Sequence, residues 1–198
     1  MSTYPSDSEC IRLLTEAGCK RRVVVHCCTV WTMAEAIAER IDCDIDLVRA
    51  GAFLHDIGRS VDHSIMHAVI GASIARKLGL PEEIVQIIKR HIGAGLDQYD
   101  VKEMNLPDDD YMPITIEQKI VCHADNLVSD NKFVVHDYSV DRLMHKGSVR
   151  GAKRIAALHK ELSELYGSDI DELVTKLGPY PNMKGACAPF TVPPEARS

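Results

Sequence analysis

Six side chains of the types that bind metal ions fall on or beside the apolar stripes of five predicted helices. They are His26, His55, Asp56, His67, His91 and Asp125. A single histidine on such a stripe is more often a core residue than a ligand, but packing the stripes together would bring all six to one centre. Burying an ionised carboxylate costs several kcal/mol unless it is paired or bound to a metal. A shared metal site is therefore the preferred interpretation.

The residue types indicate which ions and which chemistry the site would support. Imidazole and carboxylate suit divalent Mn, Fe, Co, Ni, Zn or Mg, and the lack of cysteine ligands argues against a structural zinc cage. A carboxylate can bridge two cations about 3.5–4 Å apart, as two-metal hydrolases require. Asp56 is the natural bridge because its neighbour His55 would already bind one ion. A hydroxide held by the two ions would then attack phosphorus, which makes Asp56 the catalytic residue.

The elements that must position these residues are predicted to be helices. Apolar residues recur at helical spacing, and glycine or proline marks most of the boundaries. The expected helices cover 8–17, 21–41, 44–57, 63–78, 81–92, 115–129, 139–146, 148–166 and 169–177. We expect an ordered loop over 96–113 and find no strand-turn-strand pattern. The prediction is an all-α, single-domain helical bundle.

Within this bundle, four segments are expected to play different parts. Residues 1–20 form an N-terminal helix, 21–130 a metal-binding core, and 131–177 further helices packed on that core. Residues 178–198 contain five of the nine prolines and are expected to be an extended or disordered tail.

Composition narrows the class of protein. The chain has 198 residues, 23 basic and 29 acidic, for a formal net charge of −6, which argues against broad nonspecific binding of nucleic acid. Seven cysteines without a CxxC pair make a disulfide framework improbable and favour a reducing compartment. Neither a signal peptide nor a membrane-spanning run is evident. We expect a cytoplasmic protein that does not enter a membrane.

The order and context of the six residues resemble the H…HD…D signature of the HD-domain superfamily of metal-dependent phosphohydrolases. The stretch His55-Asp56-Ile57-Gly58-Arg59 looks like the HDIG-type branch. Further matching positions are His67, Gly71-Ala72, Arg90-His91 and Ala124-Asp125-Asn126-Leu127-Val128. The resemblance covers about residues 22–130. It implies a metal at His26, His55, Asp56 and Asp125, and a second metal at His67 and His91 with Asp56 bridging.

Other polar residues have two interpretations each. Arg59 would face a substrate phosphate, or it is a solvated cation at a helix end. His63 would contact substrate or protonate the leaving group, or it lies on the surface. His123 should point away from Asp125. The basic residues Arg142, Lys146, Arg150 and Arg154 are better explained as a solvated face than as a phosphate or RNA contact surface.

The function expected from these observations is hydrolysis of a phosphomonoester or phosphodiester, with a small phosphorylated substrate that is a nucleotide or resembles one. One alternative is an HD-fold di-iron oxygenase, since its ligands would be nearly the same. Another is a sensor that binds a nucleotide or RNA with little turnover. The substrate, the native metal and the oligomeric state are left open by the sequence.

Overall fold

The computed structural model describes residues 3–193, and helices make up most of them, which confirms the all-α prediction. The elements are α1 (Asp7–Glu16), α2 (Arg21–Ala38), α3 (Ile45–Leu54), α4 (His67–Lys77), α5 (Glu82–Arg90), α6 (Gln98–Glu103), α7 (Ile116–Asn126), α8 (His136–His145), α9 (Val149–Tyr166), α10 (Asp171–Leu177), the 3-10 helices η1 (Ile57–Ser60) and η2 (Gly185–Phe190), and the strands β1 (Val128–Ser129) and β2 (Lys132–Phe133). Crossing a bilayer takes a long, uninterrupted apolar helix, and residues 3–193 contain none.

Several helices begin where a polar side chain can accept hydrogen bonds from free backbone N–H groups. Ser6 and Glu9 form a capping box at the start of α1, and Thr115 and Gln118 form another at α7. The Asp44 carboxylate accepts hydrogen bonds from two backbone N–H groups at the start of α3. These caps are local, so the sequence alone places these helix starts to within a residue or two.

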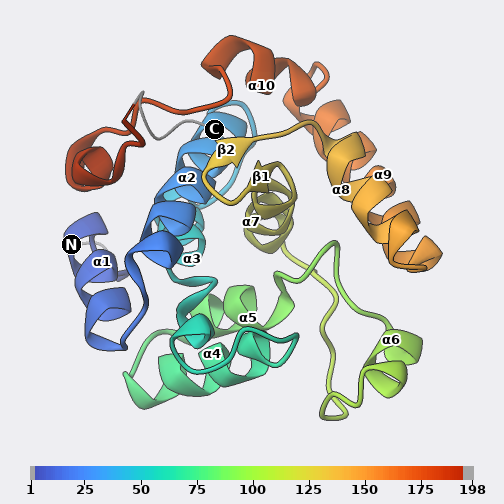
Figure 1. Cartoon of the computed structure of the whole chain (residues 1–198), viewed down its shortest axis with the longest axis horizontal. Helices are drawn as coiled ribbons and strands as arrows, with labels where there is room; N and C mark the ends of the chain where they lie inside the picture. Colours follow the sequence, from blue (N-terminus) through green and yellow to red (C-terminus); the bar gives the residue numbers. More distant parts are fainter. Residues whose placement is uncertain (1–2, 194–198) are drawn as a thin grey trace.

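The core lies where α2, α3 and α7 pack together, with α4 and α5 against one side and the α8–α9 pair on another (Figure 1). Phe53, Met33, Ile37 and Ile120 are fully buried there. Removing a side chain of this size from water stabilises the fold by about 1.5–3 kcal/mol. The same packing holds the inner faces of the helices at fixed distances from one another.

The helix that carries the His-Asp pair ends earlier than expected. We predict a helix to Ile57, whereas α3 stops at Leu54 and the chain turns at Asp56 into the short η1 helix. The next helix was predicted from His63, but α4 begins at His67, and His63 lies exposed in the preceding loop. The turn aims the side chains of His55 and Asp56 away from the α3 axis.

The loop expected over 96–113 is ordered and contains the short helix α6. Two ion pairs attach it to the end of α5: Lys89 Nζ lies 2.9 Å from Asp109 Oδ1, and Arg90 Nη1 lies 2.9 Å from Asp110 Oδ2. Arg154 from α9 pairs with Asp97 and Asp100 on its other side. The segment is therefore fastened to both α5 and α9.

The C-terminal part of the chain differs from the expectations in two places. A hairpin of two-residue strands, β1 and β2, follows α7, although no such pattern was predicted. The tail contains the short helix η2, which packs on α1 and α2, and Met183 and Cys187 are buried; residues 178–184 and 191–193 have no helix or strand. Arg21 of α2 donates a hydrogen bond of 2.8 Å to the Pro189 carbonyl. Residues 194–198 of the predicted tail lie outside the described residues.

Candidate metal centre

The structure brings all six predicted ligand residues to one centre. His26 comes from α2, His55 and Asp56 from the turn after α3, His67 from the start of α4, His91 from the end of α5 and Asp125 from the last turn of α7. His55, Asp56, His67 and His91 are almost completely buried. Five segments of the chain thus contribute to a site that none of them could form alone.

One half of the centre surrounds the Oδ2 atom of Asp56. His26 Nε2 lies 3.6 Å and His55 Nε2 lies 3.7 Å from this oxygen. Asp125 Oδ1 completes the group, 3.0 Å from His26 Nε2 and 3.7 Å from His55 Nε2. Two imidazole nitrogens and two carboxylate oxygens therefore face a common point.

The other half surrounds the Oδ1 atom of Asp56. His67 Nε2 lies 3.2 Å and His91 Nε2 lies 3.6 Å from this second oxygen. The carboxylate of Asp56 thus faces a different pair of imidazoles with each of its oxygens. This is the arrangement needed for a carboxylate that bridges two cations.

All four imidazoles are held in the same way. Their Nδ1 atoms contact backbone carbonyl oxygens, those of Asp130, Ala52, Ser64 and Ile88 for His26, His55, His67 and His91 respectively. A carbonyl oxygen only accepts, so each Nδ1 carries a hydrogen and each Nε2 atom is directed to Asp56, where a ring without a hydrogen on Nε2 would present a lone pair. Metal-binding histidines are commonly oriented by such hydrogen bonds.

The nitrogen and oxygen atoms of the centre are better placed to bind a cation than to form hydrogen bonds with one another. The buried His55 Nε2 and Asp56 Oδ1 have no hydrogen-bond partner. His67 Nε2 and His91 Nε2 lie 3.1 Å apart, with both Nδ1 hydrogens already donated elsewhere, so two lone pairs face each other. Unpaired buried polar atoms are costly. A divalent ion on each side of Asp56 would satisfy these atoms.

The electrostatics of the centre lead to the same conclusion. Burial raises the pKa of Asp56, but the surrounding imidazoles outweigh it and hold that pKa well below its usual range. Burial lowers the pKa of His55 to about 4, so this ring is neutral. Burial also disfavours charge on His26, yet the hydrogen bond and charge of Asp125 raise its pKa to about 9. A bound cation would replace the proton that His26 holds.

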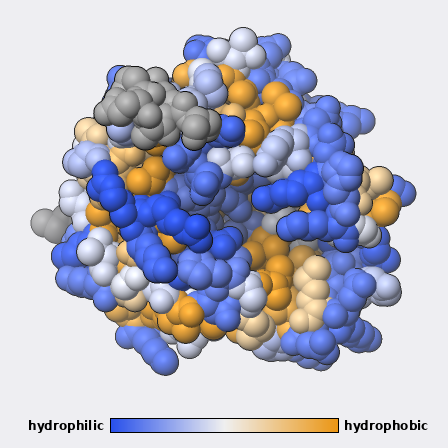
Figure 2. Space-filling view, in the orientation of Figure 1, coloured by the Kyte–Doolittle hydropathy of each residue, from blue (hydrophilic) through white to orange (hydrophobic). Residues whose placement is uncertain are grey.

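A cavity of about 200 Å³ opens onto this centre, and three arginines line it beside His26, Asp56 and Asp125: Arg22, Arg59 and Arg142. Hydrophilic side chains gather around a hollow near the middle of the face drawn in Figure 2. Arg59 Nε lies 2.6 Å from Asp56 Oδ2, which places the guanidinium at the rim of the centre. His63 does not line this cavity.

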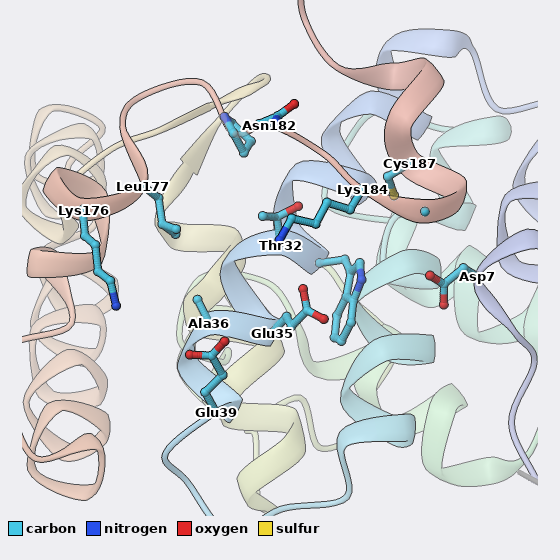
Figure 3. Close-up of a pocket in the computed structure, with 13 residues that line it drawn as sticks. Asp7, Thr32, Glu35, Ala36, Glu39, Lys176, Leu177, Asn182, Lys184 and Cys187 are labelled. Carbon is cyan, nitrogen blue, oxygen red and sulfur yellow. The ribbon is translucent and has the colours of Figure 1, made fainter.

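A larger cavity, of about 580 Å³, lies elsewhere (Figure 3). Glu35 of α2, Glu39 just after this helix, Lys176 of α10 and Lys184 of the tail line it. No histidine lines this cavity. The size of a cavity does not by itself indicate a reaction, so the smaller cavity at the histidine centre is the better candidate for the active site.

A second group of histidines lies apart from the centre and joins α7 to α8, α9 and α10. His123 Nε2 is 3.0 Å from His159 Nδ1, and His136 Nδ1 is 2.8 Å from Asp171 Oδ2. The rings of His136 and His159 stack 3.7 Å apart and 10° from parallel. Lone pairs of stacked rings lie in parallel planes and do not converge on one ion. We interpret this group as a hydrogen-bonding network.

The sequence did not indicate three features of the centre. The Asp130 carbonyl that orients His26 comes from the tip of the hairpin, where Asp130 has a φ of 61°; only the Asp-Asn turn residues signalled it. Arg22 lies one helical turn before His26, and this spacing predicts that the two side chains share a face of the helix. Arg142 was assigned to a solvated basic face, but it lines the cavity, whereas Arg150 and Arg154 pair with acidic residues of the α6 segment.

Known proteins with similar sequences or folds support a family assignment. The chain is 43% identical over 169 residues to a tRNA (cytidine(56)-2′-O)-methyltransferase of Thermoplasma volcanium, covering 85% of the chain and 50% of that protein. It therefore spans about half the length of this relative. It is 42% identical over 158 residues to the uncharacterised protein MJ0778 of Methanocaldococcus jannaschii, covering 74% of the chain and 91% of that protein.

A solved structure has a similar fold at low sequence identity. It is the HD domain of the Listeria monocytogenes phosphodiesterase PgpH in complex with cyclic-di-AMP, with a TM-score of 0.53, 20% identity, and coverage of 83% of this chain and 96% of that one. The profile of the HD domain family matches residues 23–130, the segment that contains all six residues of the centre. The chain belongs to the HD-domain family.

Proposed function

We propose that this protein is a metal-dependent phosphohydrolase that cleaves a phosphomonoester or phosphodiester of a nucleotide or nucleotide-like substrate. The proposal depends on one observation: the two carboxylate oxygens of Asp56 face different pairs of imidazoles. The pairs are His26 with His55 and His67 with His91. Two divalent ions would be held there, with Asp125 as a further ligand. Such ions lower the pKa of a bound water and neutralise charge on phosphate oxygens.

The side chains near the centre favour water over a protein nucleophile. Burial raises the pKa of the Cys19 thiol to about 11 and that of the Cys27 thiol well above its usual range. Both thiols are therefore protonated at neutral pH and poorly nucleophilic. Asp56 and Asp125 would instead orient the ions and the attacking water, and Arg59 at the rim would bind a phosphate oxygen.

The comparisons support parts of this proposal. The PgpH structure is the HD domain of a phosphodiesterase in complex with a cyclic dinucleotide, which favours a nucleotide substrate by analogy of fold. The Thermoplasma relative is named as an enzyme that acts on tRNA, so RNA is a second candidate partner. The seven cysteines, all free thiols, agree with action in the reducing cytoplasm.

A panel of metals and substrates tests the proposal. Purified protein would be assayed under Mn, Fe, Co, Ni, Zn and Mg with phosphomonoesters and phosphodiesters, in air and without oxygen. We expect phosphate release that is unchanged under anaerobic conditions. Oxygen consumption by iron-loaded protein without phosphate release would identify an oxygenase instead. Tight nucleotide binding without turnover under every metal would identify a sensor.

Metal removal should lower the stability of the fold, because the ions would bind the native centre and not the unfolded chain. At a metal concentration of about 100 times the dissociation constant, binding adds about 2.7 kcal/mol to the free energy of unfolding. For a chain of this size that corresponds to a rise in Tm of about 5–10 °C. Thermal unfolding of chelated and metal-reconstituted protein measures it. An identical Tm in both samples would contradict a metal centre in the core.

Replacing Arg59 by alanine should lower activity without removing the metals. The guanidinium would contribute one or two charge-assisted hydrogen bonds to the phosphate, so kcat/KM should fall about tenfold to a hundredfold. Bound metal should remain, because the Arg59–Asp56 pair competes with cations for the Oδ2 atom. Arg59→Lys, which keeps the charge, should lose less. Equal activity in all three proteins would make Arg59 a solvated cation.

A further inference from the structure

Two arginines differ from the rest of the arginines in residues 3–193. The others each contact a carboxylate, a carbonyl oxygen or an aromatic ring; they are Arg12, Arg21, Arg40, Arg49, Arg59, Arg76, Arg90, Arg150 and Arg154. Neither Arg22 nor Arg142 has a partner among the described residues. In a chain with 29 acidic and 23 basic residues, partners are not scarce. These two guanidinium groups are therefore available to bind an anion from outside the protein.

Both of these arginines line the cavity at the metal centre. Arg22 is in the first turn of α2, four residues before His26, so the two side chains share a face of the helix. Arg142 comes from α8. Both are exposed, whereas Arg59 in the same cavity is already 2.6 Å from Asp56. The rim thus has one arginine directed to the centre and two that are free to bind an anion.

We infer that Arg22 and Arg142 form a binding site for a second phosphate group of the substrate, separate from the phosphate that is cleaved. The inference rests on the proposed function, because the metal centre and Arg59 would hold the scissile phosphate. Guanidinium groups bind phosphate oxygens in pairs with defined geometry. The protein as a whole is acidic, so a local group of cations at the cavity concentrates anions there.

The surroundings of Arg22 suggest what connects the two phosphates. A neighbouring cavity of about 320 Å³ shares Arg22 and Asp130 with the first, and Val25 and Phe190 also line it. The Arg21 guanidinium lies 5.0 Å above the Phe190 ring. The space beyond Arg22 therefore has an apolar and aromatic wall, which suits a nucleoside. The substrate class is a nucleotide with at least two phosphates.

Substrates that differ in the number of phosphates test this site. Wild type and the double variant Arg22→Gln/Arg142→Gln would be assayed with AMP, which has one phosphate, ADP, which has two adjacent ones, and pApA, which has two separated by a nucleoside. The quantity compared is kcat/KM for each two-phosphate substrate divided by that for AMP. For the substrate whose phosphates reach both sites, we expect this ratio to fall at least about tenfold in the variant, through KM, as loss of charge-assisted hydrogen bonds implies.

The two longer substrates distinguish the spacing of the phosphates, since only the one that spans both sites should show the effect. Arg12→Gln and Arg76→Gln are matched controls, because these arginines are also exposed but lie outside the cavity. Neither control should change the ratio. An unchanged ratio for both ADP and pApA in the double variant would overturn the inference.

Binding measurements separate this inference from the proposed function. The dissociation constants of methylene-bridged ADP and of pApA with phosphorothioates at both phosphates, which are hydrolysed more slowly, would be measured by calorimetry with chelated protein and with added Mn. If wild type hydrolyses no ester but the double variant binds an analogue at least about tenfold more weakly, the anion site stands and the proposed function fails. If wild type hydrolyses AMP and both proteins bind the analogues equally, the anion site fails and the proposed function stands.

Discussion

Asp56→Asn is expected to abolish hydrolysis and to remove most of the bound metal. Both oxygens of Asp56 face imidazole pairs, with Oδ2 3.6 Å from His26 Nε2 and Oδ1 3.2 Å from His67 Nε2. The amide keeps the shape of the side chain but loses its charge and one acceptor oxygen, so neither ion would keep its shared ligand. We expect kcat to fall at least about a thousandfold, or about 4 kcal/mol of transition-state stabilisation.

The measurement pairs elemental analysis of the purified variant with a phosphatase and phosphodiesterase assay. Asp125 lies on one side of the centre only, so Asp125→Asn should leave the ion between His67 and His91 in place. Glu35→Gln is the control, because Glu35 is an exposed carboxylate that lines the separate, larger cavity. A full complement of metal together with wild-type activity in Asp56→Asn would remove Asp56 from the mechanism.

The convergence of the six residues could be predicted because each was expected on or beside the apolar side of one of five helices. A polar residue such as His91, preceded by Ile84, Ile87 and Ile88 at helical spacing, must face the core wherever its helix packs. The prediction therefore needed only the period of each segment, and not the arrangement of the helices. The starts of the capped helices could be predicted for a similar reason, since caps such as Thr115 act within one turn.

What could not be predicted depends on contacts between distant segments. Arg142 and Arg154 look alike in sequence, yet α8 brings the first to the metal cavity and α9 brings the second to Asp97. The tail has few apolar residues and many prolines, but its burial of Met183 and Cys187 depends on the free surface that α1 and α2 offer. Composition describes a segment by itself and contains no information about its neighbour.

The end of α3 is the clearest case of a distant contact that overrides a local pattern. Ile57 continues the apolar stripe, so the sequence predicts a helix through it, but η1 packs against α4 instead. A Cβ atom on Gly58 would lie 1.9 Å from the His67 carbonyl oxygen and 2.7 Å from the Gly71 nitrogen. Gly58 is thus required for the close approach of two backbones, beyond ending a helix.

Gly58→Ala is therefore expected to damage both the fold and the metal centre. The obstructing atoms are backbone atoms of α4, so relief requires movement of the helix that begins with His67, whose Nε2 faces Asp56. Overpacking of this kind should reduce the free energy of unfolding by about 3 kcal/mol or more, a fall in Tm of about 6–12 °C. The ion expected between His67 and His91 should be lost before the one beside His26.

Gly151→Ala in α9 is the matched control for this prediction. Its added Cβ would meet Ser148 Oγ at 2.7 Å and Leu143 Cδ1 at 3.1 Å, which are ends of side chains that can rotate away. Alanine also favours a helix interior over glycine by about 1 kcal/mol, so the stability of this variant should change little. Denaturant unfolding and metal analysis of both variants make the comparison. If Gly58→Ala were as stable as Gly151→Ala and bound the same amount of metal, then the contact between η1 and α4 would not fix the position of His67, and the second half of the centre would need another support.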